Sequence, residues 1–318
     1  LTPTVSAYTT GDITAGGAIT IDARHNVDDS GNAIAANQAS ATASNPIGAG
    51  LLAANGSYAE STASAIVSTY VAAGTVLKAG GDININARTS NKAKSKADGI
   101  TVGGLAIGAS IAQANVGGST TSYMAGRVEK GQNLIITATS FDSSIAEAFA
   151  AGGGLLSGVG ADADAKISPT VQAYISGFVE VAKDVKLDAT ETPFADANSE
   201  GIAVSGLLSV GASLADAIVD PTVKAYVSPG STIRTGQYLT GSPTLTFTAD
   251  TRETTAQMEF ITQVTATGVS LTLNATNGTI LRNDGVTWAS QGFGVGQILS
   301  LSGSTIAGNN GLYAITEI

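Results

Sequence analysis

Residues 169–174 read Pro-Thr-Val-Gln-Ala-Tyr, and residues 221–226 read Pro-Thr-Val-Lys-Ala-Tyr. Related phrases occur earlier in the chain, so that five units begin near residues 3, 65, 119, 169 and 221. Their tyrosines are 62, 53, 51 and 52 residues apart: Tyr8, Tyr70, Tyr123, Tyr174 and Tyr226. A period of about 52 residues is typical of a repeat protein, in which each unit packs mainly against its neighbours.

A second phrase follows each tyrosine, and in it large apolar residues alternate with polar ones, as in Val185-Lys186-Leu187-Asp188-Ala189. Alternation with a period of two predicts a strand with one buried face. If the units stack in register, one column should contain Ile21, Ile85, Ile136, Leu187 and Phe247. The tyrosines should then form a structural ladder. An aromatic platform for sugars is the alternative interpretation of these tyrosines.

A third phrase, Gly-Leu, recurs at residues 50, 104, 154 and 206, in step with the tyrosines. Alanines at every second position flank it, for example Ala161, Ala163 and Ala165. Alanine favours helices, but a spacing of two would spread these alanines around a helix instead of along one stripe. We therefore expect strands whose small inward side chains let two sheet faces approach closely.

The pattern predicts an all-β, elongated β-solenoid (β-helix) of about 52-residue repeats over residues 1–250. A polar stretch at 28–32 predicts a loop inserted in the first unit. From residue 251 the tyrosine phrase stops, and Asp-Gly and Asn-Gly pairs, which mark tight turns, become frequent. With Trp288, Phe293 and Tyr313 as its aromatic residues, the stretch 251–318 predicts a small β-rich module.

Composition excludes several classes of protein. The 318 residues contain no cysteine and one histidine, and only 13% are charged. A disulfide scaffold, a thiolate zinc site and a multi-histidine metal site are therefore excluded. A net charge of −10 opposes nucleic-acid binding, and no apolar run is long enough for a transmembrane helix. Because residue 1 falls within the repeat pattern, we expect the chain to be a segment of a longer protein.

Acidic pairs are the candidates for a metal site. Asp162 and Asp164 share one strand face, and Asp216 lies near Asp220. Calcium prefers clustered carboxylate and carbonyl oxygens, so these four residues could bind calcium. Because they fall between the inward alanines, a solvated face is the main interpretation. The acids are spread thinly over the units, which indicates no catalytic site, and no cofactor is expected.

Three other features have ordinary interpretations. His25 follows a strand beside the inserted loop, and we interpret it as an exposed turn residue. Lys92, Lys94 and Lys96 alternate, which predicts a solvated face or a guard against edge-to-edge aggregation, with contact to an acidic polymer or a neighbouring subunit as the alternative. The glycines at 80–81 and 152–154 lack the Gly-Lys-Ser/Thr continuation of a phosphate-binding loop.

The repeated Val-x-Ala-Tyr phrases, the run Gly-Gly-Asp-Ile-Asn-Ile-Asn-Ala at 80–87 and the Ala-x-Ala arrays together resemble a known family. The family is that of the filamentous haemagglutinin-like, autotransporter-type giant bacterial surface adhesins. The resemblance covers about 250 residues and implies export, a β-solenoid, and a role in adhesion, biofilm or cell-surface structure.

The predicted function is that of a structural and adhesive segment of a large secreted bacterial surface protein, acting as a rigid spacer or filament-forming region. Its expected partners are cell-surface or matrix polymers, or copies of itself. Two alternatives stay open: a polysaccharide-binding or -degrading β-helix, and a phage tail-fibre-like segment.

Overall fold

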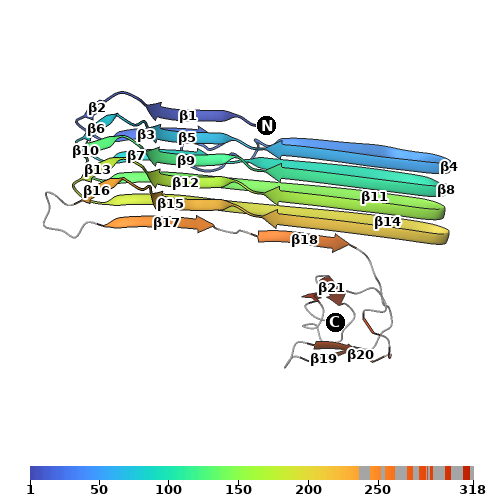
Figure 1. The fold of residues 1–318 in the computed structure, drawn as a ribbon. Helices are drawn as coiled ribbons and strands as arrows, with labels where there is room; N and C mark the ends of the chain where they lie inside the picture. The colour runs from blue at the N-terminus through green and yellow to red at the C-terminus, as the bar shows by residue number, and fades with distance from the viewer. Residues whose placement is uncertain are drawn as a thin grey trace.

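The computed structural model describes residues 1–235, 244–251, 255–261, 271–274, 279–283, 285, 287–288, 298–301 and 311–315. Every regular element within these ranges is a β-strand, and no helix occurs among them (Figure 1). The prediction of an all-β protein is confirmed, and the main sheets are parallel.

Two of the parallel sheets contain one short strand from each unit. The first sheet contains the tyrosine phrases, in the order β1 (Thr4–Thr9), β5 (Ile66–Val71), β9 (Ser119–Met124), β12 (Thr170–Ile175) and β15 (Thr222–Val227). The second contains the strands that follow them, β2 (Ile13–Ala15), β6 (Val76–Ala79), β10 (Arg127–Lys130), β13 (Phe178–Val181) and β16 (Thr232–Thr235).

The third sheet is the largest and contains the long strands. Its main order is β3 (Ile19–His25), β7 (Ile83–Thr89), β11 (Leu134–Ile167), β14 (Val185–Val219) and β17 (Leu245–Thr251). In the first two units the long strand is divided into two strands. β3 is followed by β4 (Ala39–Ala63), and β7 is followed by β8 (Lys92–Val116). β8 pairs with β11, and β4 pairs with β8. One further strand, β18 (Thr255–Ile261), pairs with β14.

The predicted register is confirmed. Ile21 pairs with Ile85, Ile85 with Ile136, Ile136 with Leu187, and Leu187 with Phe247. Parallel in-register pairing places equivalent side chains directly above one another, and the tyrosine column contains a single residue type. The inserted polar stretch forms the predicted loop between β3 and β4, where Gly31 and Asn26 have positive φ angles.

Each long strand folds back on itself at the Gly-Leu phrase. Ser144, before the phrase in β11, donates a hydrogen bond of 2.7 Å to the carbonyl oxygen of Ala114, which lies after the phrase in β8. Nearer the other end, Ser122 in β9 donates to the carbonyl oxygen of Thr137 in β11 at 2.7 Å. Each of the first four units is thus a flat loop of two facing layers, and these units are stacked side by side (Figure 1).

Two large hydrophobic cores fill most of the space between the layers, and a smaller cluster is formed by Ala23, Ala65, Val67 and Ala87. Near the Gly-Leu phrase the core consists almost entirely of alanine, including Ala112, Ala146 and Ala163. This confirms the expected small inward faces, and the short side chains allow a serine of one layer to reach the backbone of the other. Toward β10 the core is built from larger residues such as Leu77, Ile136 and Leu187.

Apart from one antiparallel bridge between Val27 and Ala33 in the inserted loop, antiparallel pairing occurs only later in the described chain. β19 (Leu271–Asn274) pairs with β20 (Thr279–Arg282), and β21 (Ile298–Leu301) pairs with β22 (Gly311–Ala314). Trp288 donates from Nε1 to the carbonyl oxygen of Ile280 at 3.0 Å. The separate module at 251–318 stays a prediction, and Phe293 lies outside the described residues. The pairing of β18 with β14 carries the parallel sheet beyond the predicted boundary, to Ile261.

Candidate interaction surfaces

The five tyrosines form one continuous stack. Neighbouring ring centroids are 4.8–5.0 Å apart, and the ring planes deviate from parallel by 3–10°. The rings lie on the outer face of the β1–β15 sheet, because the residues that alternate with them, such as Val171 and Ala173, are fully buried. Burial, followed by the neighbouring tyrosines, raises the pKa of Tyr174 to about 12.

This stacking bears on the alternative of a sugar platform. A sugar stacks on the face of an aromatic ring, yet each ring within the ladder has both faces covered by its neighbours. What the ladder presents to solvent is a row of ring edges and hydroxyl groups. The geometry therefore favours a packing role, in which the rings tie successive units together.

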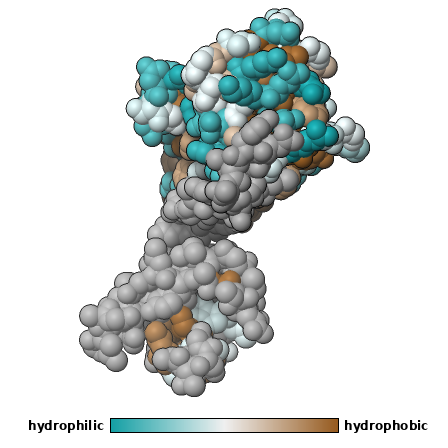
Figure 2. Space-filling model, turned by 90° about the vertical axis from the view of Figure 1, so that its left-hand side faces the viewer, coloured by the Kyte–Doolittle hydropathy of each residue, from teal (hydrophilic) through white to brown (hydrophobic). Residues whose placement is uncertain are grey.

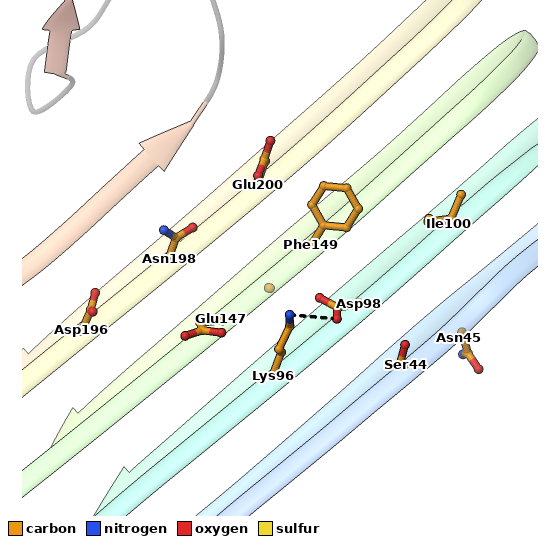
Figure 3. Close-up of a pocket in the computed structure, with 11 residues that line it drawn as sticks. Ser44, Asn45, Lys96, Asp98, Ile100, Glu147, Phe149, Asp196, Asn198 and Glu200 are labelled. Carbon is orange, nitrogen blue, oxygen red and sulfur yellow. Dashed lines mark ion pairs between the residues drawn. The ribbon is translucent and has the colours of Figure 1, made fainter.

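A shallow groove of about 580 Å³ lies on the outer face of β4, β8, β11 and β14 (Figure 3). Its side chains come from neighbouring columns of the parallel sheet: Lys96 pairs in register with Glu147, and Asp98 with Phe149. Asn198 and Glu200 of β14 continue the same two columns. The groove thus combines carboxylates, an amide and one aromatic ring, and it lies across the units instead of within one.

Two of the three alternating lysines in and beside this groove form ion pairs. Lys96 lies 3.2 Å from Asp98, and Lys94 lies 2.7 Å from Glu147. Lys92 donates to the carbonyl oxygen of Ile34 at 3.2 Å. The three lysines share one outer face, as expected. The interpretation as an edge guard is wrong, because β8 has a neighbouring strand on both sides.

The candidate calcium ligands are only partly brought together. Asp164 pairs in register with Asp216, and Gln113 donates to Asp164 at 3.2 Å on the other side. Burial, and then the charges of Asp164 and Asp216, raise the pKa of Asp162. Asp220 lies beyond the end of β14. In the part of the chain that the structure describes, no group of three or more acidic or histidine side chains could hold a metal ion.

His25 ends β3 and is half-buried, which is less exposed than the sequence indicated. A side-chain hydrogen bond of 3.0 Å joins its Nε2 to Nδ2 of Asn26. Burial lowers its pKa. Nothing in this arrangement pairs the imidazole with a nucleophile.

Sequence reasoning missed a buried acidic pair at the junction of the two cores. Asp142 is 2% exposed and Glu191 is fully buried. Asp142 accepts hydrogen bonds from the backbone amide of Asn91 at 3.0 Å and from the hydroxyl of Ser140 at 2.9 Å. The two carboxyl oxygens of Glu191 make no hydrogen bond of good geometry, and the polar groups that interact with them are those of Asp142 and Ser140. The alternation of buried and exposed residues along the two strands could have revealed this pair, because Asp142 and Glu191 both fall at positions whose side chains point inward.

Protonation explains how this pair is tolerated. Burial raises the pKa of Glu191 to about 9, with the negative charge of Asp142 as the next cause. Burial also raises the pKa of Asp142 to about 6. Both shifts favour the protonated, neutral form of a carboxyl group, which lowers the large penalty of burying two negative charges side by side.

The end of the molecule formed by β2, β6, β10, β13 and β16 is charged. Glu129 forms ion pairs of 2.9 Å with both Lys78 and Arg127, and these hydrogen bonds lower its pKa. Arg127 also lies over the ring of Phe178, 3.9 Å from its centroid. Figure 2 looks onto this end, where hydrophilic residues cover much of the visible surface.

Comparison with protein-family models, with curated proteins and with solved structures gives no match to this chain. Within the described residues there is also no helix of the length and apolarity that a membrane span requires.

Proposed function

We propose that the chain is a structural and adhesive segment of a large secreted protein of the bacterial cell surface, and that its repeats form a β-solenoid. The observation that carries the proposal is the in-register stacking of successive units, in which Tyr174 lies beside Tyr226 and Ala165 beside Ala217. Columns such as the tyrosines repeat the same side chain on successive layers, so many weak contacts to a repeating partner add up. The sequence resemblance to filamentous haemagglutinin-like adhesins supports the same role.

The proportions of a unit favour a broad contact surface. The first arm of β11, from 134 to 154, is roughly 70 Å long at about 3.3 Å per residue. Stacked strands are about 4.8 Å apart, so five units reach only about 20 Å along the stack. The long dimension of this segment therefore lies along the strands. A spacer that extends along the stacking direction would therefore need many further units.

The placement of the acidic residues supports a role without catalysis. The closest acidic pair in the interior, Asp142 and Glu191, is shielded from solvent and cannot meet a polysaccharide. In the outer groove, Glu147 and Asp98 are neutralised by lysines. The proposed partners are accordingly bound polymers of the cell surface or matrix, or further copies of the chain.

The test is binding without turnover. The purified chain is applied to immobilised bacterial surface polysaccharides and to whole cells, and the soluble fraction is analysed by mass spectrometry. We expect retention that rises with the number of units displayed, with no release of oligosaccharides. Released fragments would establish the degrading β-helix instead. A stable trimer in sedimentation would favour the tail-fibre alternative.

A further inference from the structure

A ridge of leucines runs across the turns where the long strands fold back. Leu52, Leu105, Leu156 and Leu208 form one column of the parallel stack, and each is in register with the next. The preceding leucine of three units projects further into solvent: Leu51 is 85% exposed, Leu155 55% and Leu207 73%. We call these seven residues the leucine ridge. It lies at the end of the molecule opposite β10 (Figure 1).

The turns that carry the ridge lie in long uncharged stretches of the first four units. Residues 45–59, 99–112, 148–161 and 201–214 contain no Asp, Glu, Lys or Arg. Further apolar side chains are exposed beside the leucines, namely Val102, Ile107, Val204 and Val210. Turns on a protein surface are normally polar, and the opposite end of the same units carries ion pairs. The apolar character of this end is therefore specific to it.

The exposed area is large enough for a weak interface. A fully exposed aliphatic side chain offers about 100 Å² of apolar surface, so the exposed fractions of the leucine ridge and of the four apolar residues beside it together amount to roughly 600 Å². The largest apolar patch of an ordinary monomer is about 300–600 Å², and a standard interface buries about 800 Å² on each partner. The ridge thus reaches the lower limit of a specific, reversible association.

We propose that the leucine ridge is the contact by which two copies of this chain associate, ridge against ridge. The spacing of the leucines along the stack is set by the parallel sheet, so the side chains of a second ridge have the same spacing and fit between them. A two-fold arrangement brings the same patch of both copies together and closes the contact.

The net charge of −10 does not oppose this pairing. Within β11 the nearest carboxylates, Glu147 and Asp162, lie seven residues from Gly154 and from Leu155, or about 20 Å along the strands. Between two facing ridges these charges would be about 40 Å apart, far beyond the Debye length of about 8 Å at physiological salt.

A lipid surface fits the ridge less well than a second copy. Segments that lie in a membrane interface use Lys or Arg beside the apolar residues, and Trp or Tyr at the level of the headgroups. The stretches 99–112, 148–161 and 201–214 contain none of these four residue types. The nearest flanking charges are acidic, which anionic lipids repel.

The experiment uses the absence of cysteine from the chain. Leu155→Cys introduces one thiol in the ridge, and Ile66→Cys is the matched control at an exposed apolar position on β5. Under mild oxidation we expect a disulfide-linked dimer from Leu155→Cys and at least tenfold less from Ile66→Cys. Equal yields from the two variants would overturn the proposal.

Sedimentation tests the association without a cross-link. Concentrations from about 10 µM to about 1 mM cover the weak affinities expected of a small interface. We expect the native chain and Ile66→Glu to dimerise in this range, and Leu155→Glu with Leu207→Glu to stay monomeric with an unchanged circular dichroism spectrum. If the native chain is monomeric at every concentration, the proposal is overturned. It is also overturned if the chain binds phosphatidylcholine vesicles instead of dimerising and the leucine substitutions abolish that binding. Either result leaves the polymer-binding role intact, because that role is read out on immobilised polysaccharide.

Discussion

Tyr123 and Tyr174 lie ring over ring, with centroids 4.8 Å apart and planes 3° from parallel. The two residues are 51 positions apart in sequence and occupy the same place in successive units. The pair shows how the repeat becomes a physical contact, since each tyrosine touches the equivalent residue of the next unit.

Replacing a tyrosine inside the ladder should weaken the stack. Tyr174→Ala removes contacts to Tyr123 and Tyr226, and because each aromatic pair is worth about 0.5–1.5 kcal/mol, we expect a loss of about 1–3 kcal/mol in the free energy of unfolding. Tyr8→Ala removes one contact and should cost less. Tyr174→Phe keeps the stacking and serves as the control. Urea denaturation measures all three, and an equal effect of Tyr174→Ala and Tyr174→Phe would contradict a stacking role.

The fold-back turn depends on close approach of two glycines. A Cβ atom on Gly154 would overlap the carbonyl oxygen of Gly103 in the neighbouring unit. We expect Gly154→Ala to destabilise the protein by about 1–3 kcal/mol, as overpacking does. Gly158→Ala lies in the same strand with open space at the Cβ position, and it should change stability by less than about 0.5 kcal/mol. Thermal unfolding of the two variants compares them directly, and similar melting temperatures would argue against this contact.

The alanine core should reject larger side chains. Ala163 is fully buried between the two layers, whereas Lys166 of the same strand points outward. Ala163→Leu forces the layers apart and should cost about 1–3 kcal/mol or more. Lys166→Leu adds an apolar side chain of the same size outside the core and should be tolerated. If chemical denaturation finds both variants equally stable, the two layers are not closely packed at this point.

The buried acidic pair predicts how stability depends on pH. The pKa of Glu191 is about 9 in the folded chain against 4.5 for an ordinary glutamate, so between these values the unfolded chain binds fewer protons than the folded one. Stability should therefore fall as the pH rises from about 5 to about 9.

Glu191→Gln removes the titrating group and should flatten this dependence, so that the variant equals or exceeds the native chain in stability at pH 9. Glu200→Gln, on the outer face of the same strand, is the control. Urea midpoints at pH 5, 7 and 9 give the comparison. The pair would have another role if the native chain gained stability toward pH 9.

Most of the fold could be predicted from the periodicity of the sequence. The alternation in Val185–Ala189 and the recurrence of the tyrosine phrase were sufficient to predict strands stacked in register, because a period of two defines a buried face and a recurring phrase aligns the units. The fold-back at the Gly-Leu phrase was harder to predict. A strand that reverses through glycines looks the same in sequence as one that runs straight, and only contacts such as Ser144 to Ala114 reveal the reversal.

The surfaces were less predictable than the core. Lys94 and Glu147 are 53 residues apart, and their ion pair depends on the exact register of two strands. Glu191 lies at a position that the alternation assigns to the core, but its carboxyl group is typical of a surface residue. The two criteria therefore give opposite predictions for its burial. The leucines of the ridge were recognised as a repeated landmark, but their exposure depends on the turn that places them at the end of the layers.

The flat cross-section of each unit also determines how a longer stack would respond to force. Two facing layers are thin, about 10 Å between sheets, whereas their width along the strands is roughly 70 Å. The resistance of a beam to bending grows with the cube of its depth in the bending direction. A filament built from these units would therefore behave as a ribbon, flexing across its thin direction and resisting bending within its broad plane. Such a ribbon can follow a curved surface while keeping one broad face against it.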